Sequence, residues 1–107
     1  MKFVKDGKIF DTDHSELLDS TEPNLGWLEG PVCFEQTQFF RSPAGVCFAV
    51  DHQFKCKGFF NIRPSKDHYA PSTLRRVYDS EAQCAEAMSR DGIPTESFEG
   101  RFELDVA

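Results

Sequence analysis

Two β-hairpin signals in the first half of the chain restrict the fold most. In the first, Asp6-Gly7 separates the short apolar stretches of residues 2–5 and 8–11. In the second, a Ser-Pro-Ala-Gly loop separates residues 32–41 from residues 46–50. Asp-Gly favours the positive φ angles of a type I′ turn, and Pro followed by Gly suits a longer hairpin loop. The chain is therefore predicted to begin as an antiparallel sheet.

The strand at residues 46–50 is apolar at successive positions, so both of its faces are apolar. This pattern is typical of a central strand that is covered on both sides. Residues 74–78 are predicted to form a further strand, and residues 59–62 a short one. The rest of the segment 51–72, which two prolines interrupt, is predicted to be loop.

The clearest helix signal covers residues 80–91. Ser80 and Gln83 form a capping box at its start, while Gly92 and Pro94 can end it. Three apolar residues recur at helical spacing and predict the buried stripe: Ala82, Ala85 and Met88. This helix is predicted to pack on the sheet through that stripe.

Three other segments carry weaker signals. Residues 13–16 resemble a capping box and predict one or two helical turns. Residues 21–26 are predicted to be a loop that Trp27 and Leu28 hold against the core. Residues 98–106 alternate apolar and acidic side chains, so the tail is predicted to be either a last strand or a docking peptide.

Together, these signals predict an α+β fold. Its antiparallel sheet has about four to six strands, and one main C-terminal helix packs on one face of the sheet. A chain of 107 residues is close to the usual size of one domain, so residues 1–107 are predicted to form a single domain.

The charges of the chain are strongly segregated. Residues 1–31 carry a net charge of −4, residues 32–78 carry +4, and residues 79–107 carry −6. Two interpretations follow. The acidic ends can fold against the basic middle and neutralise it, or one charged face can meet a partner of opposite charge.

The four cysteines are Cys33, Cys47, Cys56 and Cys84. The N-terminus has no apolar core of a signal peptide, and no stretch approaches the length of a membrane span. We therefore expect a cytoplasmic protein with reduced thiols and no membrane association.

Zinc binding is an alternative role for the cysteines. Cys47, His52 and Cys56, with Cys33 and His68, supply enough ligands for zinc. However, no Cys-x2-Cys knuckle is present, and buried cysteine often acts as a small apolar residue. No metal and no cofactor are therefore expected.

Catalysis is not expected either. The sequence has no glycine-rich phosphate loop and no serine nucleophile elbow, and no family signature surrounds its Cys and His residues. Residues 54–63 interleave aromatic and basic side chains, as proteins that bind single-stranded nucleic acid do. The acidic net charge argues against direct nucleic-acid binding, and the alternative is a basic loop over buried Phe side chains.

Three short motifs resemble a group of small uncharacterised proteins of bacteria and their mobile elements. They are Met1-Lys-Phe-Val-Lys-Asp-Gly-Lys-Ile-Phe-Asp-Thr12, Phe39-Phe-Arg-Ser-Pro-Ala-Gly-Val-Cys-Phe48 and Tyr78-Asp-Ser-Glu-Ala82. Phe10 and Phe40 stand where the group prefers Tyr. The resemblance implies a bacterial, phage or plasmid origin and an accessory role, and it implies no activity.

The favoured function is non-catalytic inhibition or modulation of another protein. Acidic phage inhibitors often block the nucleic-acid channel of CRISPR nucleases, and by this analogy an acidic surface would occupy the basic groove of a nucleic-acid-binding effector. The predicted partner-binding residues are Glu81, Glu86, Asp91, Glu96, Glu99, Glu103 and Asp105. The alternatives are a bacterial accessory protein of unknown target and a small nucleic-acid- or zinc-binding module.

Overall fold

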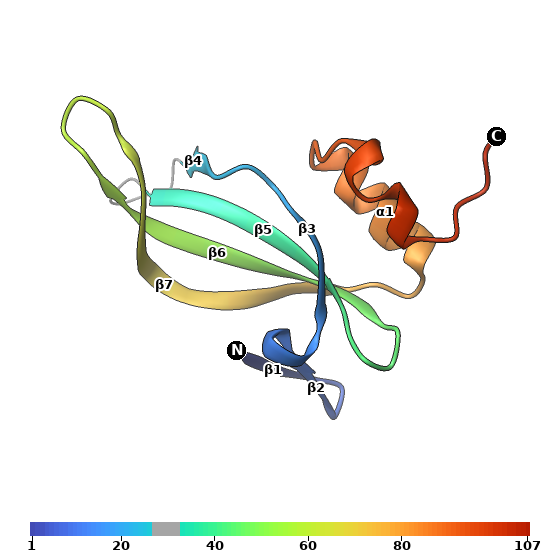
Figure 1. Ribbon diagram of the computed structural model, residues 1–107. Coiled ribbons are helices and arrows are strands. Elements are labelled where there is room, and N and C mark those ends of the chain that lie inside the picture. Colours follow the sequence, from blue (N-terminus) through green and yellow to red (C-terminus); the bar gives the residue numbers. More distant parts are fainter. Residues whose placement is uncertain (27–32) are drawn as a thin grey trace.

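The computed structural model describes residues 1–26 and 33–107 (Figure 1). The strands are β1 (Lys2–Lys5), β2 (Lys8–Asp11), β3 (Glu16–Ser20), β4 (Asn24–Gly26), β5 (Cys33–Arg41), β6 (Cys47–Lys57) and β7 (Arg63–Val77). The helix is α1 (Glu81–Arg90), and short 3-10 turns cover Thr12–His14, Thr95–Ser97 and Glu99–Arg101. The roles predicted for Trp27, Leu28 and Val32 lie outside the described residues.

The α+β prediction is confirmed. A five-stranded antiparallel sheet has the order β3-β5-β6-β7, and β4 pairs with β5 beside β3. The β1–β2 hairpin forms a separate two-stranded sheet, and α1 lies near the C-terminus (Figure 1).

Both predicted hairpin turns are present. Asp6 and Gly7 have φ angles of 50° and 74°, which are the two positive values that a type I′ turn requires. In the second hairpin, Gly45 has a φ of 84°, and its amide donates to the carbonyl of Ser42 at 2.8 Å. These local sequences therefore set the pairing of β1 with β2 and of β5 with β6.

Strand β6 is central and is covered on both faces, as predicted. Phe48 and Val50 face the β1–β2 hairpin in a cluster with Phe10 and Phe40. The Phe48 ring lies 5.2 Å from Phe10 and 5.4 Å from Phe40. Because side chains alternate along a strand, Cys47 and its neighbours on the other face join the cluster beneath α1. The sheet thus separates two apolar clusters.

Helix α1 begins and ends at the predicted residues. The Ser80 hydroxyl accepts from the Gln83 amide at 3.2 Å, although the Gln83 side chain accepts from the amide of Asp79 rather than from that of Ser80. Gly92, with a φ of 88°, follows the last turn. The Ile93 amide donates a hydrogen bond to the Met88 carbonyl at 3.1 Å, which closes the last turn of the helix.

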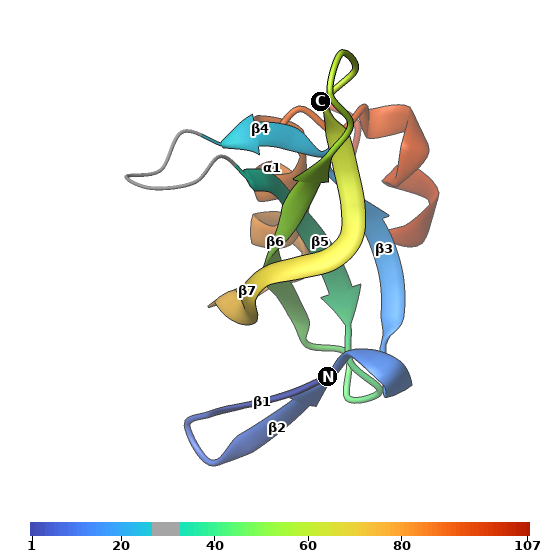
Figure 2. The same cartoon turned by 90° about the vertical axis from the view of Figure 1, so that its left-hand side faces the viewer.

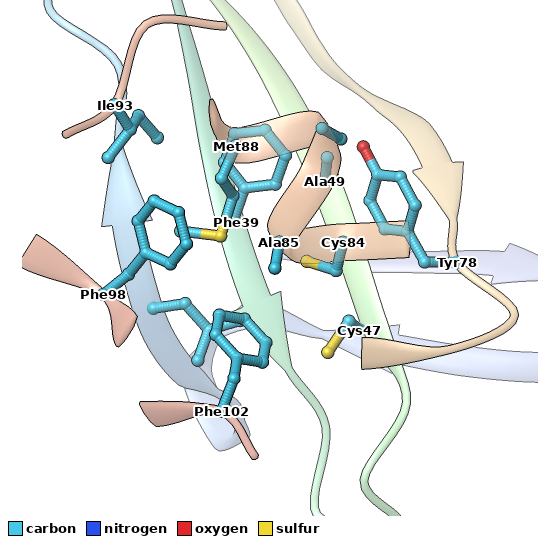
Figure 3. Close-up of a cluster of buried hydrophobic side chains, with 12 residues drawn as sticks. Phe39, Cys47, Ala49, Tyr78, Cys84, Ala85, Met88, Ile93, Phe98 and Phe102 are labelled. Atoms are coloured by element: carbon cyan, nitrogen blue, oxygen red, sulfur yellow. The ribbon is translucent and has the colours of Figure 1, made fainter. Parts of the chain in front are cut away.

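The buried stripe of α1 differs from the predicted one. Its members are Cys84, Ala85, Ala87 and Met88. Ala82 is exposed, because about 100° of rotation per residue turns it away from a face that is centred near Cys84 and Met88. Figure 3 shows the helix side chains against Phe39, with Phe98 and Phe102 beside them.

The segment 51–72 is where the predicted secondary structure fails most. Strands β6 and β7 continue as a long hairpin, so the predicted loop is mostly strand. Residues 59–62, which were expected to be a strand, form the connection between them. Pro64 and Pro71 do not break β7, because this edge strand pairs on one side only and tolerates residues without an amide hydrogen.

Three smaller predictions also need correction. Residues 13 and 14 belong to a single 3-10 turn that Asp11 caps, and Glu16 already begins β3. The predicted loop at residues 21–26 contains the short strand β4. The tail contains the 3-10 turn at Glu99–Arg101 instead of a strand, and its Phe98 and Phe102 rings are buried 5.9 Å apart.

Candidate functional site

Arg41 shows that part of the charge segregation is neutralised within the fold. Its guanidinium contacts Glu16 and Glu81 at 2.8 Å each, and it also donates to the carbonyl of Arg101 at 2.8 Å. The Arg41 hydrogen bond holds the pKa of the Glu16 carboxyl below its usual value. This one side chain from β5 therefore joins β3, α1 and the C-terminal turns.

Arg75 neutralises a second set of acids. It contacts Asp91 at 2.9 Å and Asp51 at 3.8 Å, and it donates to the Thr37 hydroxyl at 3.2 Å. The Thr37 hydroxyl in turn donates to Asp51 at 2.6 Å. These residues line a polar cavity of about 690 Å³ between the sheet and the end of α1. Two acids of this cavity, Asp51 and Asp91, are thus engaged by Arg75, and Glu35 lines the cavity as well.

The structure divides the seven predicted partner-binding acids into two groups. Glu81 and Asp91 belong to the internal ion pairs of Arg41 and Arg75. The other five are exposed on α1, on the C-terminal turns and on the tail: Glu86, Glu96, Glu99, Glu103 and Asp105. None of these five makes an ion pair with another described residue.

The basic aromatic segment of the sequence forms the end of the β6–β7 hairpin. We call residues 55–66 the β6–β7 arm. It extends well beyond the remainder of the chain, on the side away from α1 and the C-terminus (Figures 1 and 2). At its tip, Phe59 and Phe60 have relative exposures of 94% and 102%, and Ile62 is also exposed.

This exposure corrects the expectation that a basic loop would cover buried Phe side chains. The Phe59 and Phe60 rings contact each other edge to face, with centroids 5.9 Å apart and planes at 64°. The sequence does show the mixture of aromatic and basic residues, but it does not show which side of the loop the rings occupy.

The tip of the arm has a constrained backbone. Gly58 has a φ of 93°, and a Cβ atom at this position would collide with the carbonyl oxygen of Asn61. The same carbonyl accepts a hydrogen bond from Arg63 at 3.4 Å. A residue with a side chain would therefore be strained at position 58, and glycine keeps the turn tight.

The arm carries four cations that have no acidic partner among the described residues. They are Lys55, Lys57, Arg63 and Lys66. No acid occurs between residues 55 and 66, so the arm carries +4 while the rest of the chain carries −10, for the net −6. Unlike Arg41 and Arg75, none of the four makes an ion pair with a described residue.

A buried histidine fixes the base of the arm. His52 on β6 contacts the Gln38 side-chain oxygen at 2.7 Å and the Ser72 hydroxyl at 2.6 Å, which joins β5, β6 and β7. Because the Gln38 oxygen can only accept, Nε2 of His52 donates to it and Nδ1 accepts from Ser72. Burial lowers the pKa of His52, and the nearby His68 ring lowers it further.

The candidate zinc ligands are not brought together. Cys47 lies beneath α1, where it hydrogen-bonds Cys84, whereas His52 points to the opposite face of β6. Within residues 1–26 and 33–107, no group of three or more His, Cys, Asp or Glu side chains is placed to hold a metal ion. None of the four cysteines forms a disulfide bond.

No protein-family model, curated protein sequence or solved structure matches this chain. The resemblance to small proteins of bacteria and mobile elements therefore stays a prediction. No helix in the described part of the chain combines the length and the apolar character needed to cross a membrane.

Proposed function

We propose that this chain is a non-catalytic protein that binds another protein through the β6–β7 arm. The observation that carries the proposal is the almost complete exposure of two adjacent Phe rings at the arm tip. Burial of one such side chain contributes about 1.5–3 kcal/mol, and aromatic residues are typical anchors at protein interfaces. Burial of the two rings against a partner would therefore stabilise a complex.

Single exposed apolar residues do not carry the same weight, because they are common on protein surfaces. Val4 and Ile9 on the β1–β2 hairpin are an exposed cross-strand pair, but both side chains are small and aliphatic. The arm differs because it presents two contiguous aromatic rings and Ile62 at the end of a projecting element.

The interface predicted from the sequence is an alternative to the arm and lies at the other end of the molecule. There, five exposed and unpaired carboxylates support an acidic surface that occupies the basic groove of a nucleic-acid-binding effector, such as a host defence nuclease. Inhibition by a phage or mobile-element protein is the specific form of this prediction. The arm and the acidic end lie apart, so variants can test them separately.

The test is affinity purification from the organism that encodes the chain, followed by reconstitution with the purified partner. We expect the wild type and the control Val4→Ser/Ile9→Ser to retain one protein in stoichiometric amount. Phe59→Ser/Phe60→Ser should lose it while unfolding at an unchanged temperature. Retention of the same protein by the Phe variant, or recovery of nucleic acid alone, would contradict the proposal.

A further inference from the structure

We infer that the partner presents an apolar pocket with an acidic rim to the β6–β7 arm. This inference rests on the proposed function and specifies the chemistry of the partner surface. Two features of the arm carry it: the aromatic pair at the tip and the unpaired cations that flank it.

The aromatic pair is shaped for insertion. Because Phe59 and Phe60 meet edge to face, together they form one compact apolar unit, and the ring faces are not parallel. A platform for nucleic-acid bases uses open ring faces on which successive bases stack. The edge-to-face arrangement favours a pocket that encloses both rings at once.

The cations indicate the charge of the rim. Lys55 and Lys57 lie at the end of β6, while Arg63 and Lys66 lie at the start of β7, so cations flank the tip on both strands. Because none of the four makes an ion pair with a residue of the described part of the chain, all four are available to carboxylates of a partner. Complementary charges around an apolar centre accelerate association and exclude partners with basic surfaces.

The acidic remainder of the chain has limited influence at the tip. The molecule measures 46 Å along its longest axis, whereas charges are screened over about 8–10 Å at physiological ionic strength. A partner at the tip therefore meets the cations of the arm before most acids of the remainder, and the acid nearest to the arm in sequence is Asp67, directly after Lys66. A long polyanion would also approach the acidic remainder, which disfavours nucleic acid relative to a compact acidic site.

The backbone of the arm is constrained at its tip and at its base. Gly58 and Asn61 fix the turn, and the buried His52 fixes the base of the hairpin. Because fewer side chains and backbone groups need to be immobilised, more of the burial energy of the rings remains as affinity.

The experiment uses a random 12-residue peptide library, with counter-selection against Phe59→Ser/Phe60→Ser. We expect the selected peptides to combine apolar residues with Asp or Glu. Lys57→Glu/Arg63→Glu should weaken their binding roughly tenfold or more, mainly through a slower association rate. The matched control Lys5→Glu/Lys8→Glu reverses two cations of the β1–β2 hairpin and should leave the affinity unchanged.

The outcomes separate the inference from the proposed function. Arm-dependent peptides that lack acids and tolerate Lys57→Glu/Arg63→Glu would overturn the acidic rim and leave protein binding intact. If no peptide depends on the arm, the proposed function is overturned as well. Titration with a 20-nucleotide oligothymidylate tests the other ligand class, and tight binding that both arm variants abolish would overturn both proposals. Circular dichroism of each variant verifies its folding.

Discussion

Gly58 determines the shape of the arm tip at the scale of one residue. Its positive φ and the close carbonyl of Asn61 leave no space for a side chain. Gly58→Ala is therefore expected to strain the turn by about 1–3 kcal/mol and to loosen residues 57–63. Faster amide hydrogen exchange in this segment would show the effect. Gly100→Ala is the control, because open space surrounds that position, and equal behaviour of the two variants would contradict the prediction.

His52 makes stability depend on pH. Its folded pKa is below the usual value of 6.5, so the unfolded chain takes up the proton first as the pH falls. The stability that His52 contributes is fully present above pH 6.5. It decreases as the pH falls below 6.5, until the pH has passed the pKa of His52 in the folded state. Urea unfolding between about pH 7 and pH 5 should show this decrease.

His52→Gln is the control for that measurement, because glutamine keeps polar contacts but does not titrate. We expect it to be less stable at neutral pH and to lose the decrease below pH 6.5. The carboxyls of Asp11 and Glu16, whose pKa values lie below normal, affect stability only at lower pH. If the free energy of unfolding of the variant falls with pH as steeply as that of the wild type, another group is responsible for the decrease.

At the scale of elements, the contact between α1 and the sheet depends on which alanine faces inward. Ala85 is buried and Ala82 is exposed, although both belonged to the predicted stripe. Ala85→Glu is expected to lower the free energy of unfolding by several kcal/mol, since a charge would be buried without a partner. Ala82→Glu should change it by about 0.5 kcal/mol or less. Similar melting temperatures for the two variants would show that the helix docks differently.

At the scale of the whole molecule, the arm and the acidic end are alternative interfaces. Glu96→Lys/Glu99→Lys/Glu103→Lys should leave folding nearly unchanged, because exposed charges contribute little to stability. If the acidic surface occupies a basic groove, this variant should bind the partner more slowly, and the loss should shrink at high salt.

The comparison with Lys57→Glu/Arg63→Glu in the same assay decides between the two ends. A loss confined to the acidic variant would place the interface at the C-terminal third, and a loss confined to the basic variant would place it at the arm. If only Phe59→Ser/Phe60→Ser weakens binding, the contact is apolar and the acidic rim of the partner is excluded.

The sequence by itself determined the features that depend on neighbouring residues. The Asp6-Gly7 turn, the loop that ends at Gly45, the Ser80 cap and the Gly92 end of α1 were all predictable. Each depends on backbone angles or short-range hydrogen bonds that a few residues specify. The two apolar faces of β6 were predictable for the same reason, because side chains alternate strictly along a strand.

Only the tertiary structure decided which surfaces are available. The strands within residues 51–72 carry few apolar residues, so pairing with a neighbour and not the local pattern makes them strands. Arg41 and Arg75 form ion pairs with acids far away in the sequence, whereas the cations of the arm form none with residues 1–26 and 33–107. Phe59 and Phe60 are exposed because the hairpin carries them beyond the core. Burial and ion pairing depend on what lies opposite a side chain, and that is a property of the assembled fold.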